Sequence, residues 1–572
     1  MKSENVHAGD YINASVTAGS TMKGYYAANL TGIYGISGDT SPDDTHDNHK
    51  YGADMWLGDM NPGLNAWLLF DLGKVYPVGK MLVWNYNQYD PEHPEMPYVN
   101  RGMKNVSILY SIDKLNWTEL KGEKYPYRFA RADGTKALKA TNLDDGSNSP
   151  VDFGGISLRY VKLVPNSGAS DGNWGGKDGA EAAFGLSKVR FYVGRGMLVE
   201  AAEEWTELFH RFSGWTGADG IFSIPLSGLE KRGSGATTKT LFNFSDTFID
   251  EMDKTGKRSE SWTMINNSLA LLSGSEPEAD KIRFIWGKDG TFGRSSVFTP
   301  DTPSVRAMPG EHCYYWLGDG ICINGRIYYF TMLVKDDPEG LEGFCFSVFG
   351  VTLISVPLGQ DGPELGNCRQ IDTPLFHRLP EGKGDIVFGC AVMANTIEAG
   401  APNPDGYVYI YGYMPASDKE TLQLVAARVL AEDFEALEKW RFWNGIEWSE
   451  DIGQCSPIAS HICHEMSVTP MEGGLFHGKY LAVFQKDVKS GIIACSTAET
   501  PVGPFGEIVP LYSVPESEDG HGTFVYHGKA HPHLSKPGEL LISYNVNTTG
   551  FDMHLRKGEI YRPRFIRVRE IL

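Results

Sequence analysis

The sequence predicts an all-β protein with two domains. Glycine (66 of 572 residues) and aromatic residues (13 Trp, 27 Tyr and 28 Phe) are abundant, which favours turn-rich sheets over helical bundles. Apolar residues recur at helical spacing only in short stretches, most clearly at 199–212 and 432–440. A single hydrophobic core stops growing at about 250–300 residues, so a chain of this length is expected to form two cores.

The charge balance favours a neutral, hydroxyl-rich partner. A net charge of −20 lacks the basic footprint of nucleic-acid-binding proteins. Carboxylates accept hydrogen bonds from hydroxyls and aromatic rings cover C–H faces, so this composition suits a sugar. No stretch approaches the ~20 apolar residues of a membrane helix, so no membrane partner is expected. The first residues lack the apolar segment of a signal peptide, which predicts a cytoplasmic protein, or a secreted one if a leader has been removed.

The cysteines are expected to be free thiols. All eight follow residue 300, none has the paired spacing of a metal site, and several lie in strand-like runs such as 320–323. The chain also lacks HExxH, CxxC and Gly-rich phosphate-loop motifs. Catalysis is therefore expected to need no cofactor.

Residues 1–195 are predicted to form a β-sandwich. Short runs that are apolar or alternate with period two are separated by polar loops rich in Gly, Asp and Asn. The predicted strands cover residues 66–73, 80–87, 106–111, 159–164 and 186–193. The segment that follows, 196–212, is expected to be a linker.

Several phrases in this first part resemble the discoidin-like, factor V/VIII type C carbohydrate-binding modules. They are His46-Asp-Asn, Met55-Trp-Leu, Trp67-Leu-Leu-Phe-Asp-Leu-Gly, Val83-Trp-Asn-Tyr-Asn, Arg101-Gly-Met-Lys-Asn-Val, Tyr110-Ser-Ile-Asp with Trp117, and Gly185-Leu-Ser-Lys-Val-Arg-Phe. The resemblance implies a jelly-roll-like sandwich that binds sugars with loops at one end. Trp67, Phe70 and Trp84 are expected in its core, and His46, Trp56 and Trp174 are the better ligand candidates.

Such modules often carry a structural calcium ion. Many of them have Glu where this chain has Lys188, which leaves the calcium site open here. Asp39, Asp43 and Glu181 could supply oxygen ligands.

Residues 213–572 repeat one pattern and are predicted to form a five-bladed β-propeller. A polar residue opens a short apolar strand, and Gly-rich turns then lead to a second β-rich run. The openings lie 66 to 100 residues apart, at Asp219, Asp319, Gly389, Glu465 and His531.

The inner strands of a propeller line a central channel, so the polar residues that open them should converge. Hydrolysis of a glycosidic bond needs one protonated carboxyl group and one ionised carboxylate. The candidates are Asp219, Asp319 and Glu465, together with Asp246 in the first blade. An Asp before Gly, as at 219 and 319, is equally typical of a tight turn. Glu465 heads an apolar run in which an unpaired carboxylate would be costly, which favours a functional role.

Substrate-binding candidates are the aromatic residues expected at the channel mouth and three polar residues. The aromatic candidates are Trp215, Trp262, Trp316 and Tyr526; the polar ones are Arg428, Gln485 and His531. For each aromatic residue, plain packing is the alternative.

This second part resembles the five-bladed propeller glycosidases, and within them the bacterial group that includes the endo-acting D-arabinan hydrolases. The phrases are Phe242-Asn-Phe-Ser-Asp-Thr-Phe-Ile, Trp316-Leu-Gly-Asp-Gly, Asn324-Gly-Arg-Ile-Tyr-Tyr-Phe, Ala427-Arg-Val before Trp440-Arg-Phe-Trp, Glu465-Met-Ser-Val, and Ser496-Thr-Ala-Glu-Thr-Pro-Val-Gly-Pro-Phe. The resemblance implies that Asp219 or Asp246 is the base or nucleophile, that Glu465 is the proton donor, and that Asp319 tunes or orients them. Ser245 stands where relatives have Gly, which leaves the choice between Asp219 and Asp246 open.

The sequence therefore predicts a glycoside hydrolase with an appended sugar-binding module. The alternatives are a lectin-like protein that binds glycan without cleaving it and a glycoside phosphorylase. A phosphorylase would need a basic phosphate pocket, for which only Arg428 and His531 are candidates. The sugar, its linkage, the stereochemistry and the oligomeric state stay open.

Overall fold

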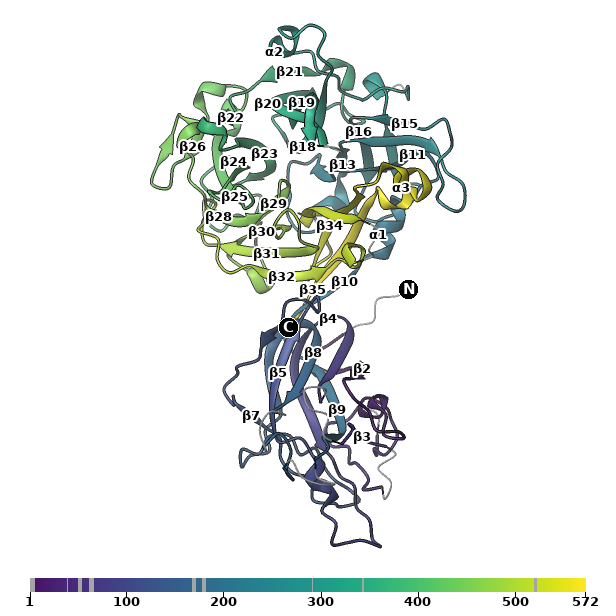
Figure 1. Ribbon diagram of the computed structural model, residues 1–572. Helices are drawn as coiled ribbons and strands as arrows, with labels where there is room; N and C mark the ends of the chain where they lie inside the picture. The colour runs from purple at the N-terminus through teal and green to yellow at the C-terminus, as the bar shows by residue number, and fades with distance from the viewer. Residues whose placement is uncertain are drawn as a thin grey trace. The chain divides into compact units, whose positions relative to one another are not determined.

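The computed structural model describes residues 6–38, 40–49, 54–60, 66–166, 171–176, 182–290, 292–341, 344–518 and 522–572 (Figure 1). Strands dominate, and the α-helices are short: α1 (Glu203–Leu208), α2 (Pro303–Arg306) and α3 (Phe551–Arg556). The all-β prediction is confirmed. None of the helices in the described ranges has the length and apolar character needed to cross a bilayer. Cys313, Cys322, Cys390, Cys455, Cys463 and Cys495 are free thiols, as expected.

The chain divides into two compact units. Unit 1 comprises Met1–Glu200 with Arg569–Leu572, and unit 2 comprises Ala201–Val568. In the segment expected to be a linker, residues 196–201 form β10 (Gly196–Ala201) and residues 203–208 form α1. Trp205, Leu208 and Phe209 are buried in a cluster of unit 2 that includes Phe242. This helix is therefore part of the core of unit 2.

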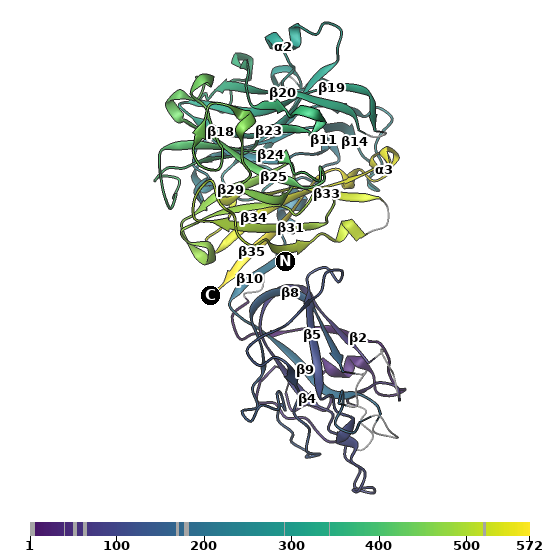
Figure 2. The ribbon, with the colours of Figure 1, turned by 60° about the vertical axis from the view of Figure 1, so that its left-hand side comes forward.

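Unit 1 is built around one long strand, β4 (Leu68–Asn85). Its first part pairs antiparallel with β2 (Ser15–Ala18), and it also pairs with β8 (Val151–Pro165) and β9 (Gly185–Val193). β5 (Asn105–Ser111) lies on the other side of β8. Figure 2 shows β4, β5, β8 and β9 running alongside one another. The short strands complete the unit: β1 (Tyr11–Ile12) and β3 (Trp56–Leu57) pair with β9, and β6 (Thr118–Glu119) and β7 (Tyr127–Arg128) pair with β5.

Unit 2 consists of successive antiparallel sheets. The first chain segment forms two sheets. One contains β11 (Ser213–Ala218), β14 (Thr247–Glu251) and β15 (Thr263–Ile265). The other contains β12 (Phe222–Pro225), β13 (Lys239–Phe244), β16 (Ser268–Ser273) and β17 (Ile282–Ile285). The next sheet is β18 (Cys313–Ile323), β19 (Arg326–Leu341), β20 (Phe344–Pro357) and β21 (Arg369–Asp372).

The remaining sheets follow the same plan. One contains β22 (Phe376–Arg378), β23 (Asp385–Ala394), β24 (Tyr407–Pro415), β25 (Leu422–Leu430), β26 (Arg441–Trp443), β27 (Trp448–Ser449) and β28 (Ala459–Ile462). Another contains β29 (Met466–Met471), β30 (Lys479–Gln485), β31 (Ile492–Ala498) and β32 (Val509–Ser513). The last strands of the unit are β33 (Thr523–Ala530), β34 (Glu539–Thr548) and β35 (Pro563–Ile571).

One strand of each sheet contacts a strand of the next. β12, β18, β23, β29 and β33 touch in that order, and a 2.6 Å hydrogen bond between Ser223 Oγ and His531 Nδ1 joins the end of this series to its beginning. In Figure 1, β18, β23 and β29 lie near the middle of the unit, with β20, β25 and β31 further out. Apolar faces of neighbouring sheets pack against each other, as where β18–β20 meet β23–β26. This arrangement brings residues that are far apart in sequence to the middle of the unit.

Candidate active site

Asp219 and Asp246 lie side by side in the first part of unit 2. Asp219 follows β11, and Asp246 lies between β13 and β14. The Asp219 N–H donates to the Asp246 carbonyl oxygen (3.1 Å), and the Ser245 N–H donates to the Asp219 carbonyl oxygen (2.9 Å). Gly220 has a left-handed φ of 56°, a conformation that glycine adopts without steric penalty, and it turns the chain from β11 into β12.

The carboxyl groups of Asp219 and Asp246 repel each other and are largely shielded from water. Burial raises the pKa of Asp219, although His527, Tyr561 and Tyr526 act in the opposite direction. Burial and the negative charge of Asp219 raise the pKa of Asp246 to about 7, against the effect of the Asn266 amide, whose Nδ2 donates to Asp246 Oδ1 (3.1 Å). Near neutral pH the pair therefore retains a proton.

Glu465 is the ionised partner of this pair. It stands immediately before β29, and its Oε2 lies 3.0 Å from Nε2 of His527 in β33. Burial raises the pKa of Glu465, but His527 and His464 outweigh burial and leave it below its usual value. Glu465 in turn raises the pKa of Asp219, so the two carboxyl groups share one electrostatic environment.

Two of the predicted aromatic residues, Tyr526 and Trp316, interact with these acids. The Tyr526 O–H donates to Asp219 Oδ2 (3.2 Å), and its oxygen accepts from Asn547 Nδ2 (3.0 Å). The side chain of Trp316 interacts with Asp246 and lowers its pKa. Trp262 is half-buried against Phe248, with ring centroids 5.8 Å apart.

The structure corrects the role expected for Asp319. This residue is buried, and its Oδ1 lies 2.6 Å from Lys529 Nζ. Its oxygens also accept from the backbone N–H groups of Gly320 and Val392, each at 2.9 Å. With these partners, Asp319 ties β18 to β23 and β33 and is a structural carboxylate.

Two further predicted binding residues are core residues. Trp215 is fully buried, packs against Phe244 and Phe284 (centroids 5.0 and 4.6 Å away), and donates from Nε1 to Ser268 Oγ. His531 is buried with both ring nitrogens engaged, Nδ1 by Ser223 and Nε2 by Ser543 Oγ (2.7 Å). Neither side chain has a free face for a sugar.

Arg428 and Gln485 are also engaged elsewhere. Arg428 lies on β25, and its guanidinium carbon is 4.0 Å from the ring centroid of Tyr407 and 4.1 Å from that of Trp448. Gln485 is buried at the end of β30 and donates from Nε2 to the Val488 and Ser490 carbonyl oxygens. Both side chains thus have partners within their own sheets, and their binding of substrate stays a prediction.

The sequence analysis missed His527 and Tyr561, both of which act on Asp219. The sequence analysis places the fifth strand opening at His531, four positions beyond His527. The sequence signal for His527 is the polar Tyr-His pair before Gly528, ahead of the buried run of β33.

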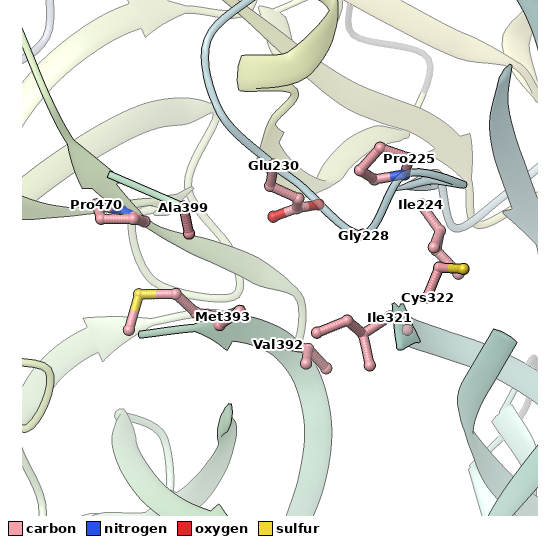
Figure 3. Close-up of a pocket in the computed structure, with 12 residues that line it drawn as sticks. Ile224, Pro225, Gly228, Glu230, Ile321, Cys322, Val392, Met393, Ala399 and Pro470 are labelled. Carbon is pink, nitrogen blue, oxygen red and sulfur yellow. The ribbon is translucent and has the colours of Figure 1, made fainter. Parts of the chain in front are cut away.

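A pocket elsewhere in unit 2 is lined by a different acid, Glu230. Figure 3 shows its carboxyl group between apolar side chains that include Pro225, Ala399 and Met393. Burial raises the pKa of Glu230 to about 8 although Lys529 lowers it. None of Asp219, Asp246 and Glu465 lines this pocket, so it is separate from the acid cluster.

In unit 1, the ligand candidates proposed from the sequence have packing roles. Trp56 and His46 are fully buried. Trp174 is flanked by cations, with Lys104 Nζ 5.4 Å and Arg128 Cζ 4.8 Å from its ring centroid. The first two are corrected to core residues, and Trp174 contacts basic side chains of its own unit.

The carbonyl oxygens beside Lys188 are not free to bind a calcium ion. Lys188 is buried and its ammonium group donates to the carbonyl oxygens of Asn29 and Asp54, so a fixed positive charge already binds these oxygens. Asp43 is exposed, and Asp39 and Glu181 lie outside the described residues. The described positions contain no cluster of three or more His, Cys, Asp or Glu suited to a metal.

We therefore expect calcium to leave the stability of the protein unchanged. The Tm measured by differential scanning calorimetry should agree within error in excess EDTA and in excess calcium chloride, because the ammonium group of Lys188 and a divalent cation would repel each other. A rise in Tm on adding calcium would contradict this expectation.

Comparison with known proteins assigns unit 2 to a family. The family model for DUF5005, a domain of unknown function, matches residues 202–571. The chain belongs to this family. The acid cluster of Asp219, Asp246 and Glu465 lies inside the DUF5005 region. A sequence comparison with curated proteins finds no match.

Solved structures similar to parts of the chain include both enzymes and binding modules. A candidate hydrolase from Bacteroides ovatus ATCC 8483 is 20% identical over 65% of this chain and 90% of its own, with a TM-score of 0.49. The GH43_1 enzyme from Xanthomonas citri in complex with xylose is 14% identical over 64% of this chain and 93% of its own (TM-score 0.32). CBM32-1 from a family 31 glycoside hydrolase of Clostridium perfringens is 12% identical over 32% of this chain and 96% of its own (TM-score 0.18).

Proposed function

We propose that this protein is a glycoside hydrolase whose DUF5005 region is a five-bladed β-propeller, with unit 1 as a sandwich-type sugar-binding module. One observation carries the proposal. A carboxyl pair that retains a proton near neutral pH, Asp219 and Asp246, shares its environment with an ionised carboxylate, Glu465. Glycosidic hydrolysis needs a carboxyl group in each of these two states.

The pKa directions favour roles opposite to those implied by the resemblance. Asp246, whose pKa is raised to about 7, is the proton donor to the leaving oxygen. Glu465, which His527 holds ionised, attacks the anomeric carbon or activates water. Asp219 lies beside both and keeps the proton on Asp246 by repulsion. This chemistry uses no cofactor.

The resemblance to the D-arabinan hydrolases favours an arabinan as the substrate, and this expectation is tested first. Reducing-sugar release would be measured on arabinans, galactans, xylans, fructans and glucans, with and without phosphate, using Glu465→Gln as the blank. Cleavage of one glycan by the parent alone supports a hydrolase, and cleavage that requires phosphate would support a phosphorylase. If the protein binds a glycan but cleaves none of the panel, the result would support a lectin-like protein and contradict the proposal.

The pH dependence of kcat/KM should report the ionisation of Asp246. We expect kcat/KM to fall as the pH rises above about 7, because the donor is lost when Asp246 ionises. The check is kcat/KM between pH 5 and 9 on the cleaved glycan. A profile that is flat to pH 9 would contradict the assignment of Asp246.

A further inference from the structure

Two consecutive residues of β33, Tyr526 and His527, both reach the acid cluster. Side chains of consecutive residues in a regular strand point to opposite faces of the sheet. Here the register with β34 shifts between Tyr526 and Lys529, and His527 has a left-handed φ of 60°. The two rings lie 4.3 Å apart at 86°. As a result Tyr526 binds Asp219 and His527 binds Glu465.

The surrounding structure holds this bulge in place. A left-handed φ is sterically unfavourable for a non-glycine residue, and such conformations persist where neighbours impose them. The next residue must be glycine, because a Cβ on Gly528 would lie 2.7 Å from the backbone nitrogen of Gln485 in β30. Gly220 also lies close to the His527 ring: a Cβ on Gly220 would lie 3.4 Å from Cε1 of His527, at van der Waals contact.

We propose that His527 is a positioning residue that, together with Tyr526, fixes the Glu465 carboxylate relative to Asp219. The inference rests on the proposed function. His527 Nε2 engages Oε2 of Glu465 and leaves Oε1 for the reacting atoms, while Tyr526 engages Oδ2 of Asp219. One dipeptide thereby sets the separation of the two carboxyl groups, on which the course of the reaction depends.

The contact with His527 also keeps Glu465 ionised. The titratable groups that act on these residues are Asp219 and Tyr526 near His527, and His464, Tyr413, Cys390 and Cys463 around Glu465. His464 lies against Tyr413, with ring centroids 4.8 Å apart. Among these contributions, the interaction with His527 lowers the pKa of Glu465 most.

The test is His527→Gln, which keeps an N–H donor of similar reach but carries no charge. We expect kcat to fall at least tenfold with KM changed less than twofold, and the acidic limb of the kcat profile to move to higher pH. The matched control is His461→Gln. His461 also has a left-handed φ (62°) and pairs with a carboxylate, Asp487 (2.8 Å), but it is exposed on β28. This control should leave kcat and the pH profile unchanged.

A second measurement needs no substrate. The lowered pKa of Glu465 stabilises the fold above the unfolded value of about 4.3, and this contribution disappears as the pH falls through the folded value. The Tm of the parent should exceed that of His527→Gln at pH 6, and the gap should close toward pH 3. A gap that does not change with pH, or an unchanged kcat profile, would overturn the positioning role. If no glycan is cleaved, the proposed function fails, and the Tm series still decides whether His527 holds Glu465.

Discussion

Glu465→Gln should lower kcat by about 10³–10⁴ and leave the protein folded. Glutamine has nearly the shape of glutamate and can still meet His527, but it can neither attack the anomeric carbon nor accept a proton from water. Glu465 lies immediately before β29 with its side chain 12% exposed, and it acts on Asp219 of the acid pair. The measurement is kcat on the glycan that the panel identifies, with circular dichroism to check the fold.

The matched control for this change is Glu472→Gln. Glu472 is exposed and pairs with Lys231 (2.7 Å), so the same substitution there should leave kcat within twofold of the parent. If Glu465→Gln kept more than a tenth of the parent's kcat, Glu465 would not be the attacking or activating carboxylate.

Asp246→Asn should move activity and stability in opposite directions. Removing the proton donor is expected to lower kcat by about 10²–10⁴. A carboxyl pKa raised in the folded state destabilises the fold; this cost is full above the folded value of about 7 and vanishes below the unfolded value of about 3.9. Asn carries no charge, so the variant should be more stable than the parent at pH 8 by about 1–2 kcal/mol and equally stable near pH 3.5.

Asp250→Asn is the control on the neighbouring strand β14. Asp250 is buried, lies 3.6 Å from Arg258, and accepts a hydrogen bond from Ser259 Oγ (2.6 Å). Because Asp250→Asn removes the negative partner of a buried ion pair, it should lower the free energy of unfolding by about 3 kcal/mol. Urea unfolding at both pH values measures these differences. A variant Asp246→Asn that is less stable than the parent at pH 8 would contradict the shared proton.

The sequence predicted the strands and three of the acids because both signals are local. Period-two apolar runs show which segments form strands, and β5 and β9 lie where such runs occur. Asp219 and Glu465 stand at corresponding points of a repeat, and Asp246 follows β13 beside Asp219, so a ring of sheets brings the three acids together.

The failed predictions concern polar and aromatic residues whose partners are remote in sequence. Asp319 was expected near the acids because it opens a repeat as Asp219 and Glu465 do, but its partner is Lys529, 210 positions away. The same holds for His531, which lies between Ser223 and Ser543. His527 was missed because the irregularity that lets it reach Glu465 is marked in the sequence only by the short Tyr-His-Gly segment.

By itself the sequence determined the fold class and which acids could meet, because strand periodicity and repeat spacing are written in neighbouring residues. Only the tertiary structure decided which carboxyl group holds the proton. That choice depends on burial and on charges contributed by other strands: Asp219 beside Asp246, and His527 beside Glu465. Electrostatic interactions act over a few ångströms of space, so the folded chain and not the order of residues sets the chemistry of each acid.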